Sequence, residues 1–201
     1  MPKQKITKEM VVDAAFTLVR AGGMEAVLVK DIAKQLDCSV QPIYSYCNNM
    51  EGLKHDVMVK VRAFVSQYIA QRLDEKDLFR SSGHAYVTLA KEEPQLYKLF
   101  ILQKRENVSS FDELYEKECN SKMAEAISER LGIDLLQARW LHLHMLIYTI
   151  GIGTIFSVTK PGICADEIYA QQEDAYKVFL QYVMGHPTKD DEEEAISVSE
   201  I

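Results

Sequence analysis

A cluster of amide, hydroxyl and phenol groups lies near residue 44 of this 201-residue chain, and these groups suit hydrogen bonding to another molecule. They are Gln41, Tyr44, Ser45 and Tyr46. If residues 40–47 form a helix, these side chains gather on its outer side, while Val40, Ile43 and Cys47 form the inner side. A glutamine amide can pair with the edge of adenine. The chemistry indicated here is recognition of another molecule through hydrogen bonds, for which a nucleic-acid base is one candidate.

A second short helix is predicted just before this one. Its apolar residues follow the i, i+3, i+4, i+7 rule: Val29, Ile32, Ala33 and Leu36. The sequence Asp37-Cys38-Ser39 then breaks the pattern, and Ser39 is placed to cap the following helix. Two short helices around a three-residue turn are typical of a DNA-reading helix-turn-helix, and also of a plain helical hairpin.

The flanking segments predict two more helices that would support the pair. The upstream helix has an inward stripe made of Val11, Ala14, Ala15, Leu18 and Val19. Gly22-Gly23 can end it through a left-handed residue. Downstream, Asn48 and Glu51 resemble a capping box that opens a long helix reaching about Lys76.

With these neighbours, the first quarter of the chain resembles the TetR (tetracycline-repressor) family of bacterial regulators. The family pattern appears in order as Ala14-Ala15, Gly23, Ile32-Ala33, Ser39, Pro42-Ile43-Tyr44 and Leu53. Three positions depart from it: Leu28 where Thr often opens the second helix, Cys47 where Phe is usual, and Met50 where Lys is common. These departures imply weaker or differently distributed contacts to the DNA backbone, and the same fold.

The resemblance implies a homodimer whose recognition helices enter successive major grooves of a near-palindromic operator, about 34–36 Å apart. Gln41 would read a base, while Lys30 and Lys54 would neutralise phosphates. The predicted DNA-binding residues are Lys30, Ser39, Val40, Gln41, Pro42, Tyr44, Ser45, Tyr46 and Lys54. Pro42 is compatible with a helix there because the first helical turn needs no hydrogen bond from its nitrogen.

The distribution of charge along the chain agrees with a DNA-binding segment at the start of the chain and a different role for the remainder. The whole chain carries a formal net charge of −7, but residues 1–62 carry +2 and the remainder −9. A mildly basic segment joined to an acidic one is typical of a DNA-reading domain attached to a sensor.

The rest of the chain keeps helical periods, which predicts an all-α protein of about nine helices. The later helices are expected at residues 79–93, 94–102, 110–131, 134–158 and 166–184. We expect a helix-turn-helix domain at 1–52, a ligand-binding and dimerisation domain at 53–184, and an acidic, disordered tail at 185–201.

An effector cavity is expected between helices of the second domain, lined by aromatic and sulfur-containing side chains with a few polar groups. The candidate lining residues are His84, Phe100, Tyr115, Met123, Trp140, His144 and Tyr148. The last two helices are expected to pair with their copies in a four-helix dimer interface. The candidate interface residues are Leu146, Ile150, Gly151, Gly153, Phe179 and Val183.

The sequence gives little support for catalysis or for binding of a metal or cofactor. It has no nucleophile elbow, phosphate-binding glycine loop or zinc-binding helix motif, and His142 and His144 are too close in sequence to share a metal on one helix. No enzyme activity, metal or cofactor is expected. The remaining alternatives are a helical adaptor that binds proteins instead of DNA, and a second domain with enzymatic or metal activity.

The composition also indicates a compartment. Four scattered cysteines without paired spacing are consistent with a reducing cytoplasm. The apolar run at residues 141–158 contains two histidines, and we expect it to form a buried interface helix instead of a membrane span.

Overall fold

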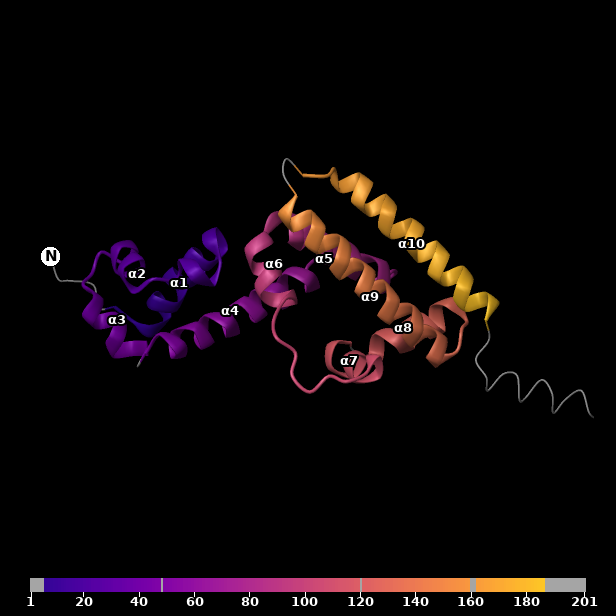
Figure 1. The fold of residues 1–201 in the computed structure, drawn as a ribbon, viewed down its shortest axis with the longest axis horizontal. Helices are drawn as coiled ribbons and strands as arrows, with labels where there is room; N and C mark the ends of the chain where they lie inside the picture. The colour runs from indigo at the N-terminus through magenta and orange to yellow at the C-terminus, as the bar shows by residue number, and fades with distance from the viewer. Residues whose placement is uncertain (1–5, 48, 120, 160–161, 187–201) are drawn as a thin grey trace, which may run out of the picture. The chain divides into compact units, whose positions relative to one another are not determined.

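The computed structural model describes residues 6–47, 49–119, 121–159 and 162–186, with the side chains of Tyr46 and Cys47 left aside. Within those ranges, the regular elements are ten α-helices and one short 3-10 helix (Figure 1). The predicted all-α class is confirmed. Residues 187–201 of the predicted acidic tail fall outside the described residues.

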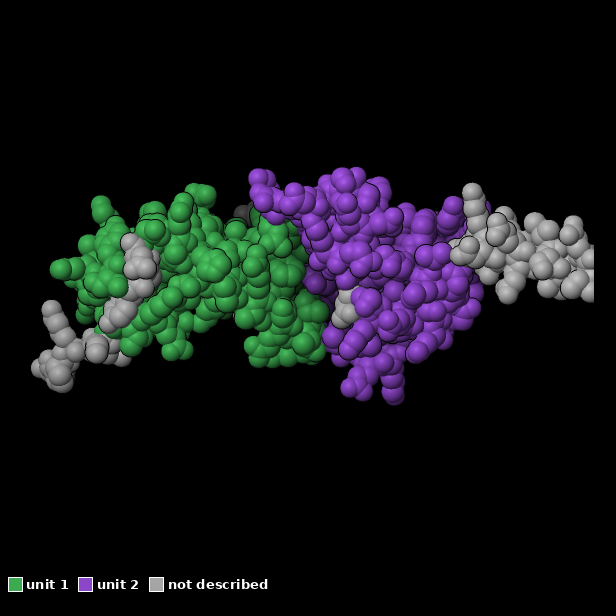
Figure 2. Space-filling view, turned by 90° about the horizontal axis from the view of Figure 1, so that it is seen from below, with its two compact units in different colours: residues 1–71, 89–103 green, residues 72–88, 104–201 purple. Residues whose placement is uncertain are grey.

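The chain forms two compact units (Figure 2). Unit 1 comprises residues 1–71 and 89–103, and unit 2 comprises residues 72–88 and 104–201. Helix α5 (Leu78–Glu92) begins in unit 2 and ends in unit 1. The predicted boundary at residue 52 is a division by function and remains a prediction, whereas the compact units divide elsewhere along the chain.

Unit 1 is built around α1 (Lys8–Gly22), which packs against every other complete helix of the unit. These are η1 (Met24–Ala26), α2 (Val29–Gln35), α3 (Val40–Cys47), α4 (Met50–Ala70) and α6 (Pro94–Ile101). The predicted stripes form its core, since Val11 and Val19 of α1 and Val57 of α4 are fully buried. Burial of these apolar faces is what holds the short helices α2 and α3 in place, because isolated helices of that length are marginal in water.

Both ends of α4 differ from prediction. Its N-cap is Asn49, whose Oδ1 accepts a hydrogen bond from the Gly52 amide at 2.8 Å; the predicted cap, Asn48, lies outside the described residues. The helix ends at Ala70, before the predicted Lys76. The reason is local: the carboxylate of Asp74 accepts the Lys76 amide at 2.9 Å, and this turn competes with continued helix.

Unit 2 contains most of α5 together with α7 (Phe111–Glu118), α8 (Ser121–Leu131), α9 (Leu135–Val158) and α10 (Ala165–Gly185). Ser110 caps α7 as expected, accepting the Glu113 amide at 3.1 Å. The predicted single helix at 110–131 is wrong, because Cys119 is extended and ends α7. This break gives ten helices where nine were expected.

Helices α9 and α10 run side by side in opposite directions, and α8 packs on α9 (Figure 1). A capping box opens α9: Asp134 accepts the Gln137 amide at 2.8 Å, and the Gln137 side chain accepts the Asp134 amide at 3.0 Å. By length and composition alone α9 could cross a membrane, and 28% of its most apolar window is buried. It packs against α8 and α10, and the larger part of this window is not buried within the unit.

Candidate functional site

The turn between α2 and α3 is a Schellman motif. The Cys38 amide donates to the Ala33 carbonyl at 3.0 Å and the Asp37 amide donates to the Lys34 carbonyl at 3.3 Å. Asp37 adopts a positive φ of 47°, the left-handed conformation in which glycine is usual. This short, hydrogen-bonded turn fixes the direction in which α3 leaves α2.

The structure agrees with the predicted sides of α3 for Gln41, Ile43 and Tyr44. Val40 was expected on the inner side but is exposed, because it is the first residue of the helix. Ile43 is 1% exposed and lies in the core, where α3 packs against α1 and α2. On the other side Val40 and Tyr44 are 40% and 53% exposed, and Gln41 is also exposed. An amide, a phenol and an aliphatic side chain are therefore presented outward from a helix that is anchored on its inner side.

The other predicted DNA-binding residues lie around this helix. Ser39 is exposed directly before α3, and Lys30 and Lys54 are exposed on α2 and α4. Ser45 donates its hydroxyl to the Gln41 carbonyl at 3.1 Å, so in this arrangement it serves the helix backbone. Pro42 is partly buried in the first turn, as its missing amide hydrogen allows.

Leu28 and Tyr46 are two further residues named in the sequence analysis of this region. Leu28 occupies the N-cap of α2 without a side-chain hydrogen bond, so the cap that threonine would supply is absent. The side chain of Tyr46, predicted to contact DNA, is outside the described part of the chain.

Unit 2 contains a mostly apolar cavity with about 550 Å³ of free space, part of it open to solvent. Its walls come from α5, α9 and α10. The aromatic and aliphatic lining comprises Phe79, Tyr86, His142, Met145, Leu146 and Tyr176. Apolar walls of this kind with a few convergent polar groups are typical of small-molecule sites.

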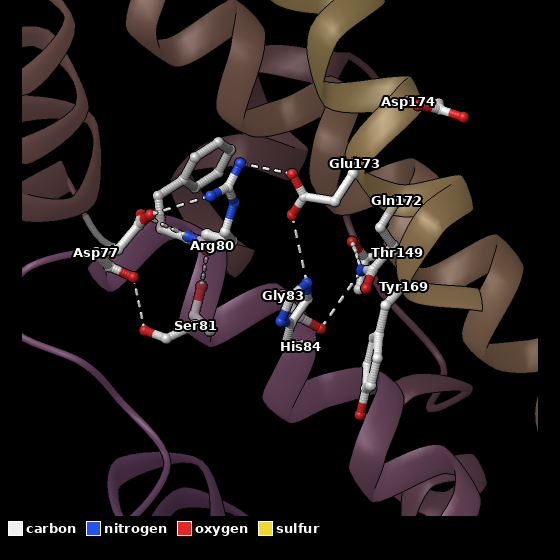
Figure 3. A network of polar contacts seen from close by, with 12 residues as sticks. Asp77, Arg80, Ser81, Gly83, His84, Thr149, Tyr169, Gln172, Glu173 and Asp174 are labelled. Atoms are coloured by element: carbon white, nitrogen blue, oxygen red, sulfur yellow. Dashed lines mark hydrogen bonds and ion pairs between the residues drawn. The ribbon is translucent and has the colours of Figure 1, made fainter. Parts of the chain in front are cut away.

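Gln172 is the most buried polar group of that lining, at 3% exposed. Its Nε2 donates to Thr149 Oγ1 at 3.1 Å and lies 3.4 Å from the Gly83 carbonyl (Figure 3). Because a carbonyl can only accept, the amide must turn its nitrogen toward Gly83. This leaves Oε1 buried without a hydrogen-bond partner among the described residues.

A charged network borders the same wall (Figure 3). Arg80 donates to Glu173 Oε2 at 2.5 Å and lies 3.8 Å from Asp77, which also pairs with Arg130 at 3.0 Å. The buried His84 Nε2 lies 3.5 Å from Glu173 Oε1, too far for a good hydrogen bond. The two arginines and two carboxylates balance in charge, while His84 keeps a polar atom that is poorly satisfied.

His142 joins the cavity to the neighbouring core. Its Nδ1 is 3.0 Å from the Tyr115 hydroxyl, and its ring meets Phe79 edge-on. Burial lowers the pKa of His142 from 6.5 to about 4, because charge is costly away from water. The same cause raises the pKa of Tyr115 to about 12. Both groups are therefore neutral near pH 7.

Of the predicted pocket residues, only His84 lines this cavity, whereas Tyr115, Trp140 and His144 come together in a separate groove lined by α7 and α9. Tyr115 reaches the cavity only through His142. Phe100 belongs to α6 of unit 1, so it is not part of this site. The remaining four lie elsewhere in unit 2: Met123 lines a groove beside α8, Trp140 and His144 stack on each other in an outer groove, and Tyr148 contacts Phe179.

Gln172, Thr149 and Gly83 were missed, although two of them leave a signal in the sequence. Thr149 stands on the buried stripe of α9 between Met145 and Gly153, and Gln172 follows Ile168 by one helical turn. A polar residue on an otherwise buried apolar stripe must find a partner. Two such stripes on consecutive helices could have suggested the pair.

Most predicted interface residues face the interior of their own unit. Val183 is 3% exposed, Gly153 is buried, and Leu146 lines the cavity. Phe179 packs against the core, and Ile150 is partly buried.

Gly151 is the exception, since it is exposed and its outer side is open. It lies within an exposed stripe of α9, which we call the outer stripe: Leu136, Ile147, Gly151, Ile155 and Val158. On α10, the apolar side chains of Val178 and Tyr182 are also exposed.

The known proteins that are similar to this chain are described as transcriptional regulators. No protein-family model matches the chain. A relative from Bacillus subtilis (strain 168), described as the uncharacterized HTH-type transcriptional regulator YobS, is 24% identical over 105 residues. The match covers 51% of this chain and 55% of that protein, so about half of the relative's length is matched.

Two solved structures have a related chain path. A transcriptional regulator from Rhodococcus sp. Rha1 superposes with a TM-score of 0.56 at 12% identity, covering 88% of this chain and 97% of that one. A putative transcription regulator from Streptomyces coelicor gives a TM-score of 0.48 at 18% identity, covering 92% and 98%. The first of these shows that the fold is one already seen in a regulator.

Proposed function

We propose that the chain is a DNA-binding transcriptional regulator of the TetR type, a cytoplasmic homodimer that a small molecule releases from its operator. The observation that carries the proposal is the helix-turn-helix itself. A hydrogen-bonded turn directs α3 outward, and α3 presents Gln41 and Tyr44 to solvent while Ile43 anchors it. The YobS match, whose description names a helix-turn-helix regulator, supports the same conclusion.

In the proposed complex α3 enters the major groove and Gln41 pairs with a base, most favourably adenine. Lys30 and Lys54, exposed on the flanking helices, would contact phosphates on either side. Phosphate contacts set affinity and register, whereas the base contact sets sequence preference. The two roles predict different effects of substitution.

A dimer would place two copies of α3 on successive turns of a near-palindromic site. The outer stripe of α9, with Val178 and Tyr182 of α10, is the surface we propose for self-association. Ile155 and Val178 are 56% and 61% exposed, and large apolar side chains left exposed in this number are a reason to propose an interaction site. The open side of Gly151 would allow a partner helix to approach closely.

The unit 2 cavity is the proposed effector site. Helix α5 lines it with Gly83 and His84 and continues into unit 1. There, Glu93 pairs with Arg20 of α1, and Glu92 with Tyr68 of α4. A ligand that favours one position of α5 would thereby shift the population of DNA-binding conformations.

The test is DNA binding by the purified protein, first in a random-sequence selection and then on the selected site. Affinity should fall by about three orders of magnitude or more between about 50 and 200 mM salt, if six or more phosphates are contacted. Gln41→Ala should cost about 1–3 kcal/mol on the selected site and relax preference at one base pair. Gln67→Ala, on the exposed side of α4, is the matched control.

The adaptor alternative predicts a different result. A protein-binding hairpin would select no preferred DNA site, and its apparent affinity for DNA would not depend on Gln41. Such an outcome would contradict the proposed function.

A further inference from the structure

The unit 2 cavity has walls that restrict what it can accept. Its aromatic side chains, including Phe79 and Tyr176, suit a flat apolar group, because rings stack or meet edge-on at low cost. Met145 and Leu146 add aliphatic surface. A ligand must therefore be mainly apolar to gain from desolvation here.

The charges around the cavity leave nothing for an ionic ligand to neutralise. Arg80 and Glu173 bind each other, and Asp77 is shared between Arg80 and Arg130. Asp174 points away from this network (Figure 3) and pairs with Lys177. A bound carboxylate would compete with Glu173 for Arg80, and a bound ammonium would compete with Arg80 for Glu173. Either ion would also lose its hydration.

One polar feature of the wall remains unused. Gln172 Oε1 is buried and lacks a hydrogen-bond partner among the described residues, and its orientation is fixed because Nε2 is held by Thr149 and Gly83. A buried acceptor left unpaired is costly, so a ligand that donates a hydrogen bond to it recovers that cost. His84 Nε2 is a second poorly satisfied atom of the same lining, and a hydroxyl could serve it as donor or acceptor.

We propose that the cavity binds an uncharged, mainly apolar ring compound that donates a hydrogen bond to Gln172 Oε1, such as an alcohol or a phenol. The inference rests on the proposed function for its biological meaning, since it identifies the chemical class of the effector. The binding itself requires no DNA and can be measured separately.

The experiment uses four probes that share one ring and differ in one substituent: benzyl alcohol, toluene, benzylamine and benzoate. Binding to the full chain is followed by NMR from the ¹³C-labelled methyl group of Met145 in the cavity, with Met58 of unit 1 as the distant reference. Benzyl alcohol should bind best, with toluene about tenfold weaker for want of a donor. Benzylamine and benzoate should be weaker than toluene.

Gln172→Met tests the acceptor, because it keeps the length of the side chain and removes the amide. It should reduce benzyl alcohol to the affinity of toluene while toluene binding is retained, which also shows that the cavity is intact. Gln171→Met, one residue away and exposed, should leave both affinities unchanged.

The inference is overturned if benzyl alcohol binds no better than toluene, if a charged probe matches or exceeds it, or if none of the four shifts Met145. Should Gln172→Met fail to fold, the order of the four probes on the unsubstituted chain decides. Selective alcohol binding by a protein without a preferred DNA site would keep this inference and remove the proposed function. If the protein bound an operator but the four probes bound in a different order of affinity, the proposed function would stand and this inference would fail.

Discussion

Asp37 is the residue on which the angle between α2 and α3 depends, because its φ of 47° closes the Schellman motif. Aspartate tolerates this conformation better than most residues, and a β-branched residue tolerates it poorly. Asp37→Val should therefore lower the free energy of unfolding by about 1–2 kcal/mol. Asp37→Gly removes the same carboxylate but accepts the backbone conformation.

Urea denaturation of both variants measures the difference. Asp37→Gly should be at least as stable as the original chain and should still bind the selected DNA site. If the two variants lost equal stability, the carboxylate and not the backbone conformation would be the important feature.

His142 gives a pH-dependent prediction, because its pKa of about 4 lies below the ordinary value of 6.5. As pH falls from 6.5 to 4, the imidazole of His142 gains a proton in the unfolded chain but stays neutral in the folded chain. The free energy of unfolding should therefore decrease across this interval, by up to about 3 kcal/mol from this group. Above pH 6.5 its contribution is constant.

The measurement is denaturant unfolding at several pH values for the original chain and for His142→Phe, which keeps an aromatic ring beside Phe79. The variant should show a flatter pH profile between 6.5 and 4, whatever its absolute stability. His55→Phe, on the exposed side of α4, controls for the loss of one imidazole. Parallel profiles for the original chain and His142→Phe would refute the assignment.

At the scale of elements, the start of α9 is tied to the end of α10 by Gln137. Its side-chain oxygen completes the capping box, and its Nε2 donates to the Val183 carbonyl at 2.9 Å. Glutamate is favoured in capping boxes but cannot donate this second bond. Gln137→Glu should therefore destabilise the chain by about 1–3 kcal/mol, although propensity alone suggests no loss.

Thermal unfolding followed by circular dichroism would measure this effect. Gln67→Glu, the same change at an exposed position of α4, should stay within about 0.5 kcal/mol of the original chain. If Gln137→Glu matched that control, the bond to Val183 would be of no consequence.

Helices with one regular apolar face could be predicted from the sequence, because burial of Val11, Val57 and Ile43 follows from periodicity alone. Helix ends were less predictable where two neighbouring residues could each serve as the cap. Asn48 and Asn49 are both good caps, and the structure places the cap at Asn49. The break after α7 lies at Cys119, where no glycine or proline announces it.

Of the candidate sites, the exposure of Gln41 and Tyr44 on α3 could be predicted because it depends on local spacing, whereas the exposure of Val40 was not predicted. The cavity could not, because its lining residues come from helices distant in sequence. Gln172 contacts Gly83, 89 positions away, and only tertiary packing brings them together. The same applies to Phe100, whose aromatic ring suggested a pocket but whose helix belongs to unit 1.

At the scale of the whole molecule, self-association is the first property to test. Replacing Ile147 and Ile155 of the outer stripe by glutamate would bury four carboxylates in a symmetric interface. We expect this double variant to elute as a monomer of 22.9 kDa in size-exclusion chromatography with light scattering. Its DNA affinity should fall at least about a hundredfold, since one half-site then binds alone.

The control is Leu102→Glu, which is also an exposed apolar position but lies in unit 1. It should leave the oligomeric state unchanged. A double variant that kept the size of the original chain would place the interface elsewhere, while a chain that was monomeric from the start would remove the dimer from the proposed function.

Unit 1 is discontinuous in sequence, and this limits how the protein can be taken apart. A fragment ending at residue 71 would lack α6, and with it the buried Leu96 and Tyr97 that pack beneath α1 and α4. Such a fragment would expose an apolar surface and tend to aggregate. Replacing unit 2 by another sensor domain would therefore require three junctions, near residues 71–72, 88–89 and 103–104, with the segment 89–103 retained. Any transfer of unit 1 to another protein would therefore carry along residues 89–92 of α5, the helix that lines the cavity.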